Sequence, residues 1–177
     1  MGSGTGLPGS FLALIGTGTF DNVWYWGVTI LAWSAACHWT VGVPHDLLMR
    51  ADHRGGAAAR QVDQLAAIHA ARQAAAVRVA GPYLLAVAAF ALSVVVTLAV
   101  HPGLELAQGV SFLALPLLLV KVLNVRLAIA IEAQAIRGEA LRRGLARRRF
   151  YNQLIALLAI TATALFGAAF LFGLRRW

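Results

Sequence analysis

The chain has 177 residues, the length of a single domain, and 60% of them are hydrophobic while only 12% are charged. In soluble domains about half of the residues are hydrophobic and about a quarter are charged. The apolar excess of this chain cannot be buried in a core of this size, so we expect it to face lipid. The net charge of +8 comes mainly from arginines beside apolar runs, where they anchor membrane proteins and contact anionic headgroups. No nucleic-acid-binding motif accompanies them. The composition indicates a bacterial inner-membrane protein and argues against a nucleic-acid partner.

The N-terminal segment, residues 1–20, is Gly-rich and uncharged, and its short apolar stretch cannot span a bilayer. Asp21 and Asn22 then form a natural N-cap for a first apolar span, residues 23–43, which has no charge and ends at Pro44. Aromatic side chains anchor membrane helices at the two interfaces. The aromatic residues that we expect to be interface anchors lie at the two ends of this span: Trp24, Tyr25, Trp26 and Trp39.

A basic connection, residues 45–79, follows the first span. Within it, residues 57–79 have the apolar spacing of a surface helix outside the bilayer core. The second span, residues 80–100, holds no charge and is the strongest membrane signal in the chain. It ends at the turn signal His101-Pro102-Gly103. A short connection without basic residues leads to the third span.

The third span allows two interpretations. In the first, residues 109–131 cross the bilayer and Lys121 lies near the middle. In the second, the span is about 104–123 and the helix extends into the cytoplasm to about residue 145. A charge at the bilayer centre costs about 2.5–3.5 kcal/mol on insertion scales. We favour the second interpretation because it places Lys121 at the interface.

The fourth span, residues 154–174, is again uncharged. Arginines then decide the orientation: residues 45–79 contain five and residues 137–149 contain six, whereas the N-terminal segment and the second connection contain none. The positive-inside rule places both basic connections in the cytoplasm and both termini outside. The sequence thus predicts an all-α, polytopic membrane protein with four transmembrane helices, cytoplasmic helical extensions and no soluble domain.

Cys37 is the only cysteine, which excludes internal disulfides and iron–sulfur ligation by four thiolates. The adjacent His38 lies inside the first span and is the candidate ligand for haem or bacteriochlorophyll. A bis-histidine haem needs a second histidine at the same depth. The remaining histidines are expected at other depths: His45, His53, His69 and His101. An interfacial histidine hydrogen-bonded to a neighbouring helix is therefore the favoured interpretation of His38.

The segment that follows Pro44 contains four residues with the spacing of metal ligands: His45, Asp46, Asp52 and His53. No HExxH motif or Cys/His array accompanies them. We expect Asp46 to cap a helix, and Asp52 and His53 to be solvated or paired with neighbouring arginines. No nucleophile is paired with a base either, so we expect no enzyme, no metal and no obligatory cofactor.

Lys121, Asn124 and Glu132 fall on one helix face. Inside the membrane, such a stripe is typical of an ion or proton pathway. The favoured alternative is a helix that leaves the bilayer, with its polar face against residues 57–79 or the headgroups. Arg126 lies off this face, which supports the alternative.

Small residues recur every four positions in two spans, where they allow helices to pack closely within the bundle or against another protein. They are Ala32 and Ala36 in the first span, and Ala159, Thr163 and Gly167 in the fourth.

The stretch Asn22-Val23-Trp24-Tyr25-Trp26, followed by Trp33-Ser34, His38-Trp39 and Gly42-Val43-Pro44, resembles a family of small alphaproteobacterial membrane proteins often labelled "component of the SufBCD complex". The resemblance covers residues 22–44. It implies a four-helix layout and a role beside iron–sulfur assembly, and it assigns no role to any single residue.

The sequence therefore predicts a non-catalytic accessory subunit of a larger inner-membrane complex, respiratory or photosynthetic, in contact with lipids and other integral membrane subunits. One alternative is a membrane protein that binds haem or bacteriochlorophyll through His38. A second alternative is an oligomeric transporter or channel that uses Lys121 and Glu132.

Overall fold

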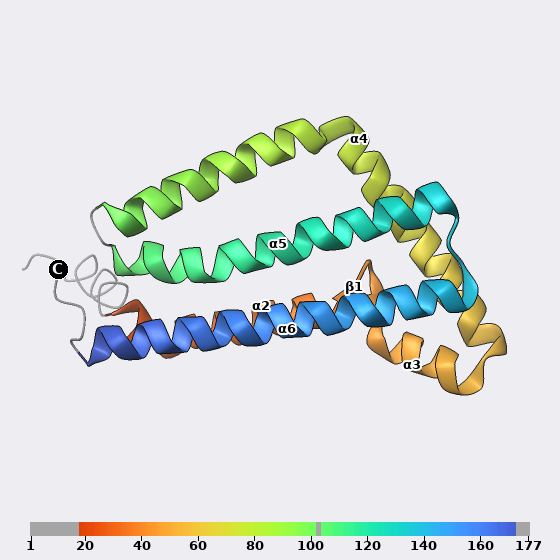
Figure 1. The fold of residues 1–177 in the computed structure, drawn as a ribbon, viewed down its shortest axis with the longest axis horizontal. Coiled ribbons are helices and arrows are strands. Elements are labelled where there is room, and N and C mark those ends of the chain that lie inside the picture. The colour runs from red at the N-terminus through yellow and green to blue at the C-terminus, as the bar shows by residue number, and fades with distance from the viewer. Residues whose placement is uncertain (1–17, 102–103, 173–177) are drawn as a thin grey trace, which may run out of the picture.

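The structure, a computed structural model, describes residues 18–101 and 104–172 (Figure 1). Apart from one short hairpin and the connections between elements, these residues are helical. The elements in chain order are η1 (Thr19–Asp21), α2 (Val23–His38), β1 (Trp39–Thr40), β2 (Val43–Pro44), α3 (His45–Arg54), α4 (Gly56–Val100), α5 (Glu105–Gln134) and α6 (Gly138–Leu171).

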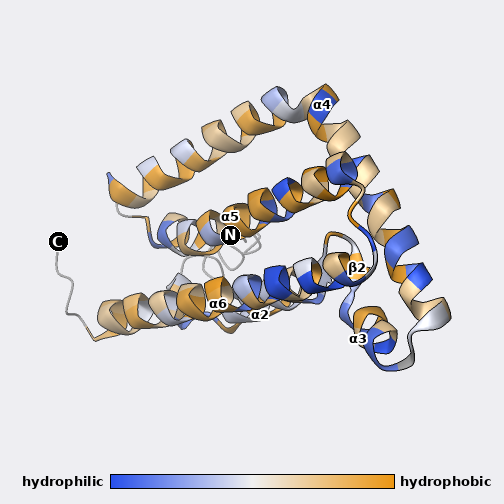
Figure 2. Cartoon of the chain, turned by 45° about the vertical axis from the view of Figure 1, so that its right-hand side comes forward, coloured by the Kyte–Doolittle hydropathy of each residue, from blue (hydrophilic) through white to orange (hydrophobic). Residues whose placement is uncertain are grey.

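Three of the described helices, α4, α5 and α6, are long and apolar enough to cross a membrane. This confirms the all-α prediction and is consistent with a membrane protein, whereas the four spans and their orientation stay predictions. Helix α2 has 16 residues, roughly 24 Å at 1.5 Å per residue, which is shorter than a hydrocarbon core of about 30 Å. Hydrophilic residues gather mostly at the end of the molecule that holds α3 and the first half of α4 (Figure 2). We call this end the basic end.

The surface helix expected at residues 57–79 and the span expected at residues 80–100 form one continuous helix, α4, of 45 residues. Its first half crosses the basic end and its second half runs back beside α5 (Figure 1). Figure 1 shows a change of direction within this helix, and the helix contains Pro82, the residue type at which sharp helix kinks mostly occur. Proline removes one N–H and its ring crowds the carbonyl four residues earlier, here that of Arg78. Residues 57–79 and 80–100 therefore belong to one bent helix, and no helix end separates them.

The helix expected over residues 23–43 stops at His38, and an antiparallel hairpin pairs Thr40 with Val43. The turn residues Val41 and Gly42 have φ of 53° and 79°, as the two-residue turn of a tight hairpin requires. The expected helical end at residue 43 is therefore wrong. The β-branched residues here favour extended backbone, and Pro44 disfavours a helical conformation for the residue before it.

The helical extension expected as far as residue 145 is also wrong, because α5 ends at Gln134. The next residue, Ala135, is left-handed, and the Ile136 N–H bonds to the carbonyl of Ile131 at 3.2 Å, the pattern of a Schellman cap. Helix α6 then begins at Gly138, whose N–H donates to Asp63 Oδ1 of α4 at 2.9 Å. Residues 138–145 thus belong to α6. Of the fourth span, residues 173–174 lie outside the described residues.

The opposite end of the bundle is joined by polar contacts around η1. The N-cap expected before residue 23 is confirmed, since Asn22 Oδ1 accepts a bond from the Trp24 N–H at 2.9 Å. The backbone N–H of Phe20 donates to Glu105 Oε1 at 2.9 Å, which connects η1 to the start of α5. The ring of Phe20 packs against Gly167 of α6, where an added Cβ would lie 3.2 Å away.

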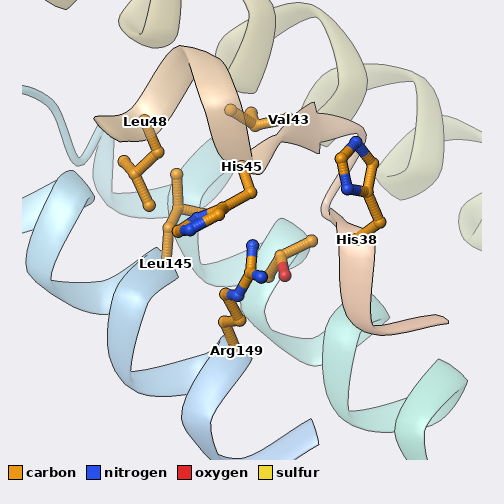
Figure 3. Close-up of a pocket in the computed structure, with 7 residues that line it drawn as sticks. His38, Val43, His45, Leu48, Leu145 and Arg149 are labelled. Carbon is orange, nitrogen blue, oxygen red and sulfur yellow. The ribbon is translucent and has the colours of Figure 1, made fainter. Parts of the chain in front are cut away.

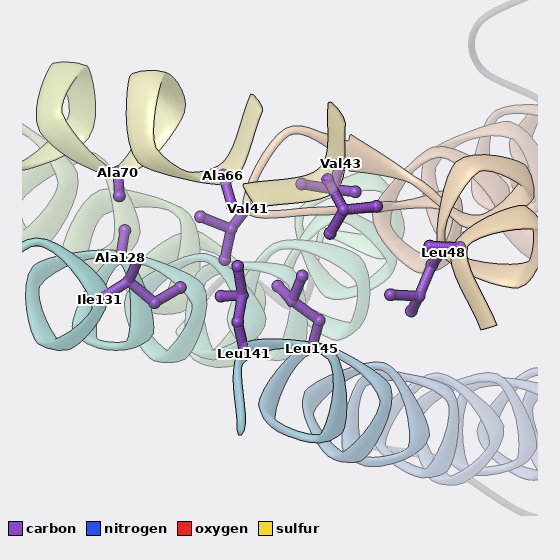
Figure 4. Close-up of a cluster of buried hydrophobic side chains, with 11 residues drawn as sticks. Val41, Val43, Leu48, Ala66, Ala70, Ala128, Ile131, Leu141 and Leu145 are labelled. Carbon is purple, nitrogen blue, oxygen red and sulfur yellow. The ribbon is translucent and has the colours of Figure 1, made fainter. Parts of the chain in front are cut away.

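The larger of two buried apolar clusters lies at the basic end, and we call it the basic-end core (Figure 4). It joins the hairpin to α3, α4, α5 and α6. Its buried members are Val41, Val43, Leu48, Ala51, Val62, Ala66, Ala70, Ala128, Ile131, Leu141 and Leu145. The second cluster, between α2, α5 and α6, has Trp33, Val120 and Ala156 as its buried members. The described chain thus concentrates its core outside the long apolar stretches.

Gly42 fixes how closely the hairpin approaches α4. An added Cβ at this position would lie 2.5 Å from Cγ of His69, and the positive φ disfavours any L side chain. Gly144 of α6 has open space around it and no positive φ. The two glycines therefore form a matched pair for a test of the hairpin.

We expect Gly42→Ala to lower the free energy of unfolding by about 2 kcal/mol or more, because it adds both backbone strain and a clash. Gly144→Ala is expected to be neutral or slightly stabilising. Detergent-solubilised protein unfolded with SDS gives both values. A His69→Ala background should recover part of the Gly42→Ala loss. Equal stability of the Gly42→Ala and Gly144→Ala variants would contradict this packing.

Candidate functional site

A small pocket lies where the end of α2, the hairpin, the start of α3 and α6 meet (Figure 3). We call it the hairpin pocket. Its central space is about 10 Å³, the room of a single water molecule or one ligand oxygen. It is lined by His38, Thr40, Val43, His45, Leu48, Leu145 and Arg149.

Three buried polar atoms of this lining have no hydrogen-bond partner among the described residues: Thr40 Oγ1, His45 Nδ1 and Arg149 Nη1. Thr40 is only 5% exposed. No carboxylate belongs to the lining. Buried polar groups are nearly always bonded, so several unpartnered atoms around one space indicate a place for a bound polar atom.

The electrostatics of the pocket act on His45. Burial, and next the positive charge of Arg149, lower the pKa of the His45 imidazole below its ordinary value of 6.5. Asp46 acts in the opposite direction, and His38 adds a small lowering effect. The neutral form of His45 is therefore favoured in the folded protein.

His38, the candidate cofactor ligand, is exposed at the end of α2 and packs edge-on against Trp39 with ring centroids 5.7 Å apart. The hairpin brings His45 to the same pocket, although the sequence placed His45 at a different depth. The two rings do not face a common point, and Arg149 reaches into the pocket from α6 (Figure 3). The role of His38 as a cofactor ligand stays a prediction.

Two of the four residues with metal-like spacing are engaged in other contacts. Asp52 forms an ion pair with Arg142 at 3.2 Å, and His53 Nδ1 lies 2.8 Å from the carbonyl oxygen of Met49. Within residues 18–101 and 104–172, no group of three or more His, Cys, Asp or Glu side chains is arranged to hold a metal ion.

The polar stripe of α5 is divided between different surroundings. Glu132 forms an ion pair with Arg78 of α4 at 3.1 Å, the contact expected if the polar face lies against residues 57–79. Asn124 Oδ1 accepts a bond at 3.3 Å from the side chain of Asn152, which is fully buried. Lys121 is exposed. The stripe therefore forms helix contacts at two of its three positions.

The expected interface anchors differ in their contacts. Trp24 and Trp39 are exposed, as lipid-interface residues are. The Tyr25 hydroxyl donates to the carbonyl of Gly109 at 3.0 Å, and Trp26 Nε1 donates to the carbonyl of Phe20 at 3.0 Å. Tyr25 and Trp26 thus bind the protein's own backbone.

The small-residue positions of α2 and α6 are distributed around the bundle interior. Ala36 and Ala159 pack against the second cluster. Thr163 is buried, and its hydroxyl donates to the Ala159 carbonyl at 2.7 Å. Gly167 is buried against η1, and Ala32 is half-buried.

An apolar groove of about 440 Å³ lies between α5 and α6, farther from the basic end. The hydroxyl of Ser111, the one polar side chain of its lining, donates to the Ala107 carbonyl at 2.7 Å, so the groove offers hydrocarbon surface. We call it the α5–α6 groove. It is lined by Ser111, Phe112, Leu115, Pro116, Leu119, Ile155, Leu158, Ala159 and Ala162.

Sequence reasoning missed the hairpin pocket because the pocket depends on a turn. The available signal was Gly42, flanked by β-branched residues and followed closely by Pro44, which is a hairpin pattern. Comparison of the chain with protein-family models, curated proteins and solved structures finds no match. The family resemblance of residues 22–44 therefore stays a prediction.

The lowered pKa of His45 makes stability depend on pH. The unfolded chain takes up this proton more readily than the folded one, so the contribution is complete above about pH 6.5 and is lost as pH falls through the lowered folded-state pKa. We expect the thermal midpoint in phosphate-free buffer to fall between pH 7 and pH 5, and to fall less in a His45→Gln variant.

A His53→Gln variant is the control, because His53 is exposed on the same helix. It should keep the wild-type dependence on pH. An unchanged dependence in His45→Gln would remove His45 from this account.

Proposed function

We propose that the chain is a non-catalytic accessory subunit of a larger bacterial inner-membrane complex, respiratory or photosynthetic, and that it docks through the α5–α6 groove. In this proposal α2 is a fourth span beside α4, α5 and α6. The observation that carries it is the apolar groove of about 440 Å³ in the membrane-crossing part of the bundle.

The groove favours an apolar helix of another subunit. Its lining offers no free hydrogen-bonding side chain, because the hydroxyl of Ser111 is already bonded within α5. Ala159 and Ala162 form part of its α6 wall, and small residues let helix backbones approach closely in lipid. A partner helix could therefore insert large apolar side chains beside them.

The second half of α4 supports the same role. Its large apolar side chains are mostly exposed, with Tyr83 at 75% and Phe90 at 72%. The buried residues of α4, which are Val62, Ala66, Ala70 and Ala74, all lie in its first half. A helix of this kind presents a long uncharged surface to lipid or to neighbouring subunits.

Orientation follows from the arginines. The α5–α6 connection and the first half of α4 share the basic end, whereas the α4–α5 connection lies at the other end (Figure 1). By the positive-inside rule the basic end is cytoplasmic and both termini are outside. This orientation leaves the groove within the bilayer.

A bulky substitution in the groove tests the proposal. We expect Ala162→Phe to reduce stoichiometric co-purification of integral membrane subunits from native membranes at least about fivefold, since the added ring occupies space needed by the partner helix. Mild-detergent gel filtration followed by native mass spectrometry measures the loss.

Ala164→Phe is the matched control, because Ala164 is exposed on α6 and outside the groove lining. It should retain the partner within about twofold of wild type. If both variants lose the partner equally, docking at the groove is wrong. If the wild-type chain is recovered alone, the accessory role itself is wrong.

A further inference from the structure

The hairpin pocket contains the positive charge of a half-buried arginine that has no acidic partner among the described residues. Arg149 is always protonated and has only donor groups. None of the ion pairs among the described residues includes it, and its Nη1 atom is buried without a hydrogen bond there. A buried donor atom of a charged group is costly to leave without a hydrogen-bond partner, so this arrangement favours an anion over a neutral ligand.

The other two unpartnered atoms, Thr40 Oγ1 and His45 Nδ1, can also donate hydrogen bonds to an anion in the pocket. The Thr40 hydroxyl is a donor in a side chain that is nine-tenths buried and lines the pocket. His45 Nδ1 is a donor in one tautomer of the neutral ring. These groups come from the hairpin, α3 and α6, and they surround a space of about 10 Å³, the size of one oxygen atom.

We propose that the hairpin pocket binds one oxygen of a phosphate group, with Arg149, His45 and Thr40 as its hydrogen-bond donors. Guanidinium groups bind phosphate oxygens through short, charge-assisted hydrogen bonds. The site is independent of the docking partner proposed above, because all three donors belong to this chain.

The position of the pocket along α6 suits a lipid headgroup as the source of the phosphate. Arg147 and Arg148 precede Arg149, and no charged residue follows until Arg175. In the proposed orientation Arg149 therefore lies at the depth of the cytoplasmic headgroups. The wider cleft lined by Arg60, Asp63, Gln64, Ala67 and Arg137 contains a carboxylate, which makes it less suited to an anion.

The test is a binding measurement on the purified full-length chain. Native mass spectrometry with phosphatidylglycerol gives a dissociation constant for the lipid source. A thermal-shift titration with sodium phosphate, compared with sodium chloride at equal ionic strength, gives the dissociation constant for free phosphate. Binding of the lipid alone identifies a headgroup, and binding of both shows that free phosphate also enters. Either result supports the phosphate site, whereas binding of neither means that the pocket holds only water and overturns it.

Three variants separate the pocket from general attraction to charge. We expect Arg149→Gln to weaken binding roughly tenfold and Thr40→Val roughly threefold, as expected for the loss of one charge-assisted and one neutral hydrogen bond. Arg147→Gln removes the same charge from an exposed position and should change binding less than about twofold.

Thr40→Val alters no charge and keeps the side-chain shape, so it remains informative if Arg149→Gln fails to fold. Equal weakening by Arg147→Gln and Arg149→Gln would overturn the proposal, as would unchanged binding in Thr40→Val.

Discussion

The close approach of the hairpin to α4 is the constraint on which the basic end depends. Gly42 lies against the ring of His69 with no room for a Cβ, and the adjacent Val41 is buried in the basic-end core despite its positive φ. Strained backbone of this kind persists only where surrounding packing holds it. Here the packing is the contact of Val41 and Val43 with side chains of α4, α5 and α6 (Figure 4).

The same turn also brings together the polar side chains of the hairpin pocket. By reversing the chain after Thr40, it returns His45 to the neighbourhood of His38 and places both beside Arg149 of α6. A continuous helix to residue 43 would carry these groups apart, because each helical residue advances the chain by about 1.5 Å. The packing of the basic-end core and the polar lining of the hairpin pocket therefore both depend on this turn.

Local sequence signals predicted part of this structure correctly. The absence of charge in residues 80–100 predicted an apolar helical stretch there, and Asn22 was recognised as an N-cap from its residue type. The pairing of Glu132 with Arg78 agrees with the interpretation that placed the polar face of α5 against residues 57–79. These features depend on neighbouring residues or on helical periodicity alone.

The features that escaped prediction depend on contacts between distant segments. Asp63 binds the first N–H of α6, and this contact, together with the left-handed Ala135, sets where α5 stops and α6 begins. The division expected between residues 79 and 80 is absent, because α4 continues through Pro82. The hairpin pocket required a turn at Val41 and Gly42 whose backbone conformation is stabilised by α4, far along the chain. Periodicity carries no information about such contacts.

Solid-state NMR of the full-length chain in phosphatidylglycerol proteoliposomes tests the central claim most directly, namely that the hairpin ends α2 and packs against α4. The account predicts extended-backbone chemical shifts for Trp39, Thr40 and Val43, together with a through-space contact between Gly42 and the ring of His69. Helical shifts that continue from His38 through Val43, without that contact, would contradict it.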